Sequence, residues 1–399
     1  MADINLHIPS KISFGLDSIN KLSTVVSQFG ERVLIVTEAI LYEPKIIDKI
    51  STLLEKRGIQ YIIFDEVIPY ATSSSIDEGV ALARGSHADL IIGLGGIKTL
   101  SIAKSIAMTT PTKNGMDDFI SGMQAKEDPL SYIEIPTTCR NPFMLADEYC
   151  VVDAKDRTAH IGKTQSNITK AVIIDPKLTQ PLPKKYTATT MFDTMLSAIE
   201  GMLSQKTNTL ADTLFSKAIE VLGKTILNAL EDPEDIRYRT DASFAGLLTA
   251  MGLSMSKMGI GAALSYSINA KFMVPKSWVG SILLPYVMEF NMSASTEKLA
   301  AIGKLLRPES SEIETADEEG LEMENETGQN APIEEANNAV ETVRELLGSA
   351  KLATRLRDFD LEIDDMIEIA GSARSFDMMN YLPRLVSTED LYEIIKAAF

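Results

Sequence analysis

Histidine and cysteine, the residues that most often bind transition metals or form disulfides, are scarce in this sequence. Its 399 residues include three histidines, His7, His87 and His160, so no histidine follows residue 160. The two cysteines, Cys139 and Cys150, are too few for a disulfide framework. Such a cysteine content is typical of a reducing compartment, and we expect a cytoplasmic protein.

Long apolar segments are also missing. No apolar run approaches the roughly 20 residues that a membrane-spanning helix needs. The first 15 residues, MADINLHIPSKISFG, lack the basic and apolar regions of a secretory signal. We therefore expect no membrane partner.

Positive charge is in deficit, with a formal net charge of −18. Eleven acidic residues and no lysine or arginine lie between Pro308 and Glu335. The rest of the chain shows no clustered basic surface of the kind that binds phosphate backbones, so nucleic acid is not an expected partner.

Within 308–332 the large aliphatic residues are Ile313 and Leu321. So little apolar surface cannot offset the entropy of ordering, which predicts a mobile acidic insertion.

The length of the chain suits two domains. In the first half, short β-branched runs alternate with helical patterns, which predicts a parallel sheet with helices on both faces. From residue 188 onward nearly every periodic segment is helical. We therefore predict an α/β domain over 1–184 and an all-helical domain over 185–399. The predicted strands lie at 32–37, 60–67, 88–95, 131–138, 148–153 and 171–175.

One predicted strand ends in a glycine cluster and passes directly into a predicted helix, IIGLGGIKTLSIAK (91–104). Glycines allow close approach of a diphosphate, and a helix N-terminus offers free amides and the positive end of the helix dipole. The alternative is an ordinary tight turn of an α/β fold. The residue types alone leave both interpretations open.

Several segments together resemble the iron-containing alcohol dehydrogenase family, which has a dehydroquinate synthase-like fold. The similarity lies in their order and spacing over nearly the whole chain. The resemblance implies an N-terminal dinucleotide-binding domain, a C-terminal helical domain and an active site between them. It also implies NAD(P)-dependent oxidation of alcohols or reduction of aldehydes, with Fe²⁺ or Zn²⁺ polarising the substrate oxygen. We further expect a homodimer or a higher homo-oligomer. The segments are PSKISFG, Gly95-Gly96 with Ala103-Lys104, Pro136-Thr137-Thr138, 172–183, 190–205, 282–291 and 352–361.

The resemblance assigns cofactor contacts to Glu38, Gly95, Gly96, Lys98, Thr137 and Thr138. Ile97 stands where the family has a third glycine, and Lys98 stands where it has serine. A β-branched side chain in the path of the diphosphate is a steric obstacle, so we expect NAD(P) to bind weakly. The Lys98 ammonium would offset part of this loss by pairing with phosphate.

The metal ligands of the family align with Asp193, Ser197, Leu264 and Lys276. The family has an Asp-x-x-x-His pair on one helix face and two further histidines later in the chain. Here the three imidazole positions hold serine, leucine and lysine. Catalytic zinc usually has three protein ligands, and a ferrous site needs histidines in comparable number. We therefore expect neither iron nor zinc.

These departures leave three hypotheses. The chain is a metal-free or non-catalytic member of the family, or a metal-independent nicotinamide-dependent reductase with Lys276 as the electrophile. In the third hypothesis, the cleft between the domains binds a small anionic ligand through Lys98, Arg140 and Lys276. A small-molecule ligand between the domains is compatible with the second and the third.

A buried Asp193 without a metal would need another positive charge. We predict an ion pair between Asp193 and Lys276, with Ser197 donating a hydrogen bond to the same carboxylate. On this basis, Lys276→Ala should destabilise the protein more than the double change with Asp193→Ala. We also expect Lys98, Lys104 and Arg140 to face the cleft.

Overall fold

Six parallel strands form the central sheet of the N-terminal half, in the order β1-β8-β5-β4-β2-β3. The computed structural model describes residues 4, 6–8, 10–66, 72–307, 331–359 and 361–399. The predicted parallel sheet is confirmed. Its strands are β1 (Lys11–Phe14), β2 (Arg32–Val36), β3 (Gln60–Phe64), β4 (Leu90–Gly95), β5 (Ser131–Pro136) and β8 (Thr169–Ile174).

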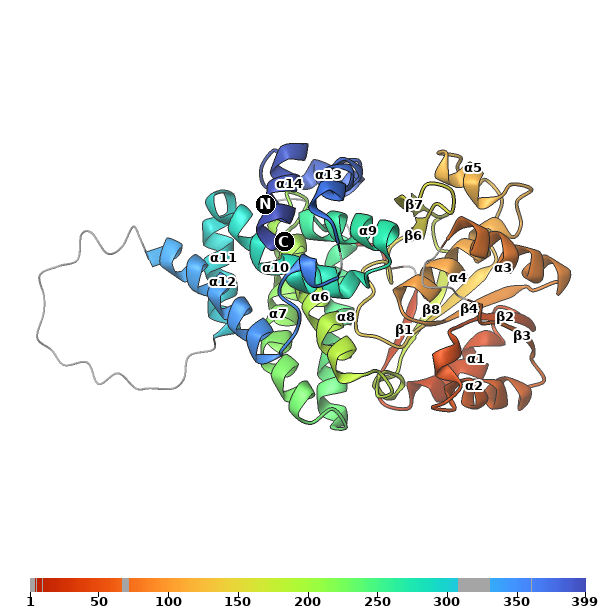
Figure 1. The fold of residues 1–399 in the computed structure, drawn as a ribbon. Helices are drawn as coiled ribbons and strands as arrows, with labels where there is room; N and C mark the ends of the chain where they lie inside the picture. The colour runs from red at the N-terminus through yellow and green to blue at the C-terminus, as the bar shows by residue number, and fades with distance from the viewer. Residues whose placement is uncertain (1–3, 5, 9, 67–71, 308–330, 360) are drawn as a thin grey trace, which may run out of the picture.

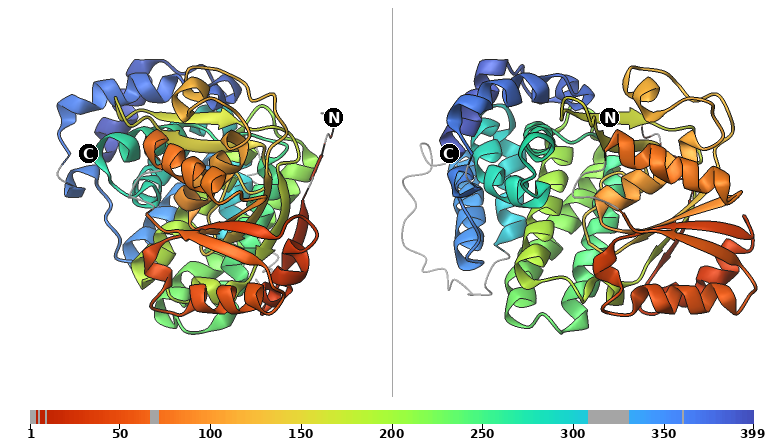
Figure 2. Two further views of the ribbon diagram at one scale, coloured as in Figure 1. Left: turned by 90° about the vertical axis from the view of Figure 1, so that its right-hand side faces the viewer. Right: turned by 45° about the vertical axis from the view of Figure 1, so that its right-hand side comes forward.

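Helices cover both faces of this sheet, α1 (Leu22–Val26) and α2 (Ile46–Glu55) on one side and α3 (Ser73–Gly85) and α4 (Ile97–Thr109) on the other (Figures 1 and 2). Side chains alternate along a strand, so a strand between two helical layers must be apolar on both faces. In β4, for example, Ile92 packs with the first pair of helices and Ile91 with the second. This explains the continuous apolar run of β4.

A separate antiparallel hairpin consists of β6 (Glu148–Val152) and β7 (Ala159–Lys163). Prediction of a strand at 148–153 was right, but its placement among the parallel strands was wrong. Parallel neighbours need a crossover of about a dozen residues or more, whereas the connection 153–158 is short enough only for an antiparallel turn. The short helix α5 (Met116–Ile120) lies near this hairpin (Figure 1).

From Lys184 onward, every regular element of the described residues is helical, as predicted. The helix α6 (Lys184–Leu203) lies at the centre of this half, and its residues 187–203 are all buried. A helix that is buried all round must be packed by others on every side. The surrounding helices are α7 (Thr209–Glu231), α8 (Ile236–Leu253), α9 (Ile260–Phe272), α10 (Lys276–Phe290), α11 (Met292–Leu306), α12 (Ala331–Ser349), α13 (Met366–Arg374) and α14 (Thr388–Ala398).

Single turns of 3₁₀ helix complete the described elements. They are η1 (Ser18–Lys21), η2 (Ala39–Leu41), η3 (Pro176–Thr179), η4 (Leu356–Phe359), η5 (Ile363–Asp365) and η6 (Asp377–Tyr381). The acidic insertion predicted at 308–332 lies outside the described residues, except for Ala331 and Pro332, which begin α12. No helix in the described ranges combines the length and apolar character needed to cross a membrane.

The two halves are in close contact at Gly246 of α8. A methyl group on Gly246 would overlap the main-chain carbonyl oxygen of Cys139, in the loop after β5. Gly371 of α13, by contrast, is exposed and has no neighbouring atom within 4 Å of the position of a methyl group.

We therefore predict opposite effects for two glycine-to-alanine changes. Gly246→Ala should lower the free energy of unfolding by about 1–3 kcal/mol, because the clash is with backbone that cannot rotate away. Gly371→Ala should leave it unchanged or raise it by up to about 1 kcal/mol, because alanine is the better helix former. Urea denaturation of both variants measures this. Equal stability of the two would contradict the tight contact between the halves.

Candidate functional site

The carboxyl ends of β2, β4 and β5 meet at one edge of the sheet, where ligands of such folds bind. Gly95 ends β4 with a φ of 157°. A methyl group on it would come within 2.7 Å of Glu38 Oε1 and 2.8 Å of Thr99 Cβ. Gly96 then caps α4, and the amide of Thr137 donates to the carbonyl of Gly95 at 3.0 Å. The structure thus places Glu38 next to the glycine pair.

The carboxylate of Glu38 binds to the N-terminus of α4. Its Oε1 accepts hydrogen bonds from the amide of Gly96 at 2.9 Å and from the hydroxyl of Thr99 at 2.5 Å. A carboxylate at this position is favoured by the positive end of the helix dipole. The donors that would meet a bound diphosphate are therefore engaged with a side chain of the protein itself.

A cavity of about 370 Å³ opens beside this loop, between the starts of α4, α6 and α10. Among the predicted site residues, it is lined by Glu38, Gly96, Lys98, Thr138 and Lys276, together with Arg140. Burial lowers the pKa of Lys98 to about 8, against the opposing effect of the Glu38 carboxylate. The remaining lining residues are Ala39, Ile40, Ile97, Thr99, Tyr186, Thr190, Pro275 and Ser277.

Behind this cavity, Asp193 of α6 lies fully buried between two positive side chains. Its Oδ1 accepts a hydrogen bond from Lys276 Nζ at 2.5 Å, and its Oδ2 is in direct contact with Arg140 Nε. Lys276 begins α10, and Gly280 one turn later leaves room for the carboxylate, since a methyl group at 280 would overlap Oδ1. The predicted Asp193–Lys276 ion pair is thus present.

Arg140 was missed as the second partner of Asp193, although we expected it to face the cleft. The side chain is 3% exposed, and its Nη2 donates to the Tyr266 hydroxyl at 3.1 Å. Lys276 Nζ lies 5.0 Å from the centre of the Tyr266 ring, a cation–π geometry. Burial and then the Arg140 guanidinium lower the pKa of Lys276, while the charge of Glu200 opposes this shift.

Ser197 does not bind the Asp193 carboxylate, contrary to our expectation. Its hydroxyl donates to the main-chain oxygen of Asp193 at 2.9 Å. Serine inside a helix often makes this bond to the residue four positions earlier, and it leaves the carboxylate free for the two cations.

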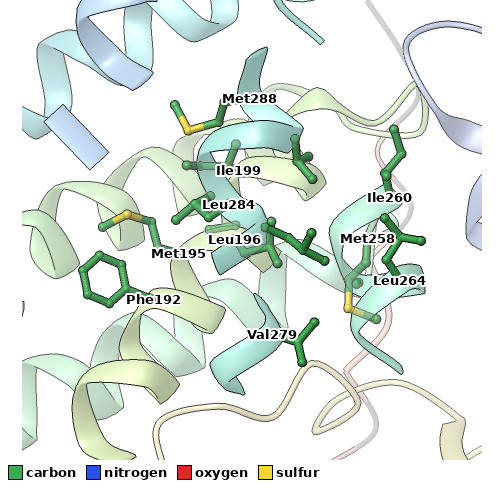
Figure 3. Close-up of a cluster of buried hydrophobic side chains, with 14 of the residues drawn as sticks. Phe192, Met195, Leu196, Ile199, Met258, Ile260, Leu264, Val279, Leu284 and Met288 are labelled. Atoms are coloured by element: carbon green, nitrogen blue, oxygen red, sulfur yellow. The ribbon is translucent and has the colours of Figure 1, made fainter. Parts of the chain in front are cut away.

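Leu264, at the position of the second family histidine, belongs to the hydrophobic core of the helical half. It is fully buried, and Figure 3 shows it near Met258 and Ile260. A hydrocarbon side chain offers no ligand atom. With Lys276 and Arg140 bound to the one carboxylate, the set Asp193, Ser197, Leu264 and Lys276 does not fit iron or zinc.

Lys104 does not face the cavity, which corrects another expectation. It is 2% exposed, and its ammonium donates to the carbonyl oxygens of Phe143 at 2.7 Å and Ala146 at 3.1 Å. It also lies 3.9 Å from Glu134. Its role is to hold the loop between β5 and β6 against α4.

Elsewhere in the described chain, one group of three side chains has the spacing of metal ligands, namely Asp153, Asp156 and His160. These residues belong to the β6–β7 hairpin. The carboxylates of Asp153 and Asp156 accept hydrogen bonds from the amides of Lys155 and Thr158, respectively. Such bonds are those of an ordinary turn, and none of the three residues lines the cavity beside α4.

A parallel-sheet domain with a glycine loop, followed by a helical domain across a cavity, defines a class of two-domain dinucleotide-binding proteins. The comparisons with known proteins identify the family within it. The family model "Iron-containing alcohol dehydrogenase" matches residues 9–176, and the model of the C-terminal region of the same family matches residues 187–399. The chain belongs to the iron-containing alcohol dehydrogenase family.

Relatives are similar over nearly their whole length. Lactaldehyde reductase of Escherichia coli (strain K12) is 24% identical over 390 residues, which are 97% of each chain. The structure of a 1,3-propanediol oxidoreductase has a TM-score of 0.89 at 22% identity and covers 100% of both chains. Sulfoacetaldehyde reductase from Bifidobacterium kashiwanohense, in complex with NAD⁺, has a TM-score of 0.84 at 16% identity, covering 100% of this chain and 99% of that one.

Because Asp193 has two cationic partners, the charge cluster predicts that loss of the carboxylate destabilises the protein more than loss of one cation. Asp193→Asn leaves Lys276 and Arg140 buried together without their carboxylate and should cost about 3–5 kcal/mol. Lys276→Met leaves the Arg140–Asp193 pair and should cost no more than about 2 kcal/mol. Urea denaturation of the two variants tests this order.

Two further outcomes are informative. The double change Arg140→Met with Lys276→Met strands the carboxylate and should be at least as damaging as Asp193→Asn. A Lys276→Met variant less stable than the Asp193→Asn variant would mean that Arg140 does not compensate Asp193.

Proposed function

We propose that this protein is a metal-free member of its family, in which two side-chain cations occupy the place of Fe²⁺ or Zn²⁺ beside Asp193. The observation that supports the proposal is the 2.5 Å contact between Lys276 Nζ and Asp193 Oδ1, with Arg140 on the other carboxylate oxygen. A divalent ion would have to displace both cations from Asp193. It would then find the Asp193 carboxylate as its one anionic ligand among Asp193, Ser197, Leu264 and Lys276. Metal-dependent alcohol oxidation is therefore not the activity that we propose.

The nicotinamide site is also altered in this proposal. When bound, a nicotinamide cofactor supplies or accepts a hydride, and Gly96, Lys98 and Thr138, which line the cavity, would hold it. A diphosphate at the N-terminus of α4 would have to displace the Glu38 carboxylate from Gly96 and Thr99. Ile97 adds a branched side chain at the same place. We propose that both features weaken the affinity for NAD(P).

A second candidate is a metal-independent reductase, which the position of Lys276 favours. Its side chain lines the same cavity as Gly96 and Thr138. An ammonium there can stabilise a developing alkoxide, although less strongly than a divalent ion. The lowered pKa of Lys276, caused by burial and Arg140, would also make it a better proton donor to that oxygen. In this candidate Lys276 replaces the metal as the electrophile.

Elemental analysis distinguishes the metal-free proposal from conventional family chemistry. Protein produced with iron and zinc in the medium should contain far less than stoichiometric metal, because the ligands are absent. The matched control is the variant Arg140→Gly, Ser197→His, Leu264→His, Lys276→His, which restores the residue types of the family and should retain metal if it folds. Stoichiometric metal in the unmodified protein, removable with loss of activity, would overturn the proposal.

Calorimetric titration with NAD⁺, NADH and NADPH tests the cofactor site. The unmodified protein should bind them weakly, and Ile97→Gly with Lys98→Ser should strengthen binding, because the branched side chain is removed. Glu38→Gln should strengthen the binding of inorganic pyrophosphate if the carboxylate competes for the loop donors. Micromolar NAD⁺ binding by the unmodified protein would show that the loop accommodates the cofactor, and would favour the reductase.

A further inference from the structure

A second, smaller cavity adjoins the one beside α4. Four residues line both spaces, namely Ile97, Lys98, Arg140 and Lys276. The smaller cavity has a volume of about 30 Å³, room for roughly one or two water-sized groups. Its other lining residues are Ser101, Cys150, Val152, Tyr266 and Asn269.

Three basic residues line the smaller cavity, although most of the surface exposed to it is apolar. Lys98, Arg140 and Lys276 all reach it, with the polar side chains of Ser101 and Asn269 beside them. None of the described residues that line it is acidic. The Arg140 guanidinium contributes to lowering the pKa of both lysines.

The nearby carboxylates are directed elsewhere. Both oxygens of Asp193 are in contact with cations, on the side of α6. Glu38 lines only the larger cavity, where its Oε1 binds Gly96 and Thr99. Glu200, whose charge favours the Lys276 ammonium, accepts hydrogen bonds from the main-chain amides of Gly259, Gly261 and Ala262 at the start of α9. None of these carboxylates lines the smaller cavity, so a ligand anion there would meet the three basic residues without an acidic neighbour in the lining.

We propose that the smaller cavity binds the carboxylate of a small organic acid, such as a 2-hydroxy or 2-oxo acid, and that the rest of the ligand lies in the larger cavity. The size of the space favours a planar carboxylate over a tetrahedral phosphate. Thr138, Thr190, Tyr186 and Ser277, which carry hydroxyl groups, are among the residues that line the larger cavity and suit a polar remainder. The inference rests on the metal-free proposal, because Lys276 and Arg140 take these positions beside Asp193 only where no divalent cation does.

Glycolate and its neutral analogue glycolamide provide a matched pair of probes. Calorimetric titration at pH 7 in the presence of EDTA should give at least about tenfold tighter binding of glycolate than of glycolamide, since only glycolate has the charge. Inorganic phosphate should bind about tenfold more weakly than glycolate because of its size.

Two lysine variants locate the site. Lys98→Met should weaken glycolate binding about tenfold, because it removes one of the three cations without touching the Asp193 cluster. Lys185→Met is the control, since Lys185 is exposed and precedes Tyr186 of the larger cavity. Lys185→Met should leave binding unchanged if the effect is local and not one of net charge.

The outcomes separate this inference from the metal-free proposal. Glycolate binding that requires added zinc or iron and disappears in EDTA would overturn the metal-free proposal, because the acid would then be a metal ligand. Equal binding of glycolamide, equal effects of the two lysine variants, or phosphate binding as tight as glycolate would each overturn the carboxylate site alone.

Discussion

The buried carboxylate of Asp193 is the constraint on which the site depends. An ionised group at 0% exposure costs several kcal/mol unless it is paired, and here it is paired twice. Lys276 comes from the same helical half as Asp193, whereas Arg140 comes from the loop after β5 of the α/β half. The pairing therefore fixes α6, α10 and that loop relative to one another. It also places two cations at the inner end of the cavity beside α4.

Charge follows a definite order from the glycine loop to this inner end. At the outer end, the Glu38 carboxylate binds the amide of Gly96 and the hydroxyl of Thr99. Deeper in, Lys98, Arg140 and Lys276 surround the smaller cavity, and Asp193 lies behind the last two. The chain thus combines the family fold with these charges along its cleft. Because a fold does not determine the chemistry of its site, membership of the family does not by itself assign metal-dependent alcohol oxidation.

The sequence was sufficient for the fold class, because the alternation of short apolar runs with helical patterns indicates a parallel sheet between helical layers. The sequence did not predict that β6 pairs with β7 in a separate hairpin, because this pairing is decided by the short turn between them and not by the residues of β6. The Asp193–Lys276 pair followed from alignment and from the cost of an unpaired buried charge. The contact between Arg140 and Asp193 and the hydrogen-bond partner of Ser197 could not be predicted in this way, because the direction of a side chain depends on packing. Lys104 was misplaced for the same reason, since its ammonium is held by carbonyl groups of a loop 39 or more residues away in sequence.

Anomalous X-ray diffraction tests the central claim most directly. Crystals grown with iron and zinc salts would be measured at the absorption edge of each metal. The account predicts no anomalous peak beside Asp193 and a Lys276 ammonium within hydrogen-bond distance of its Oδ1. A peak at about 2.0–2.2 Å from an Asp193 oxygen, the ligand distance for a catalytic metal, with Lys276 displaced from the carboxylate, would contradict it.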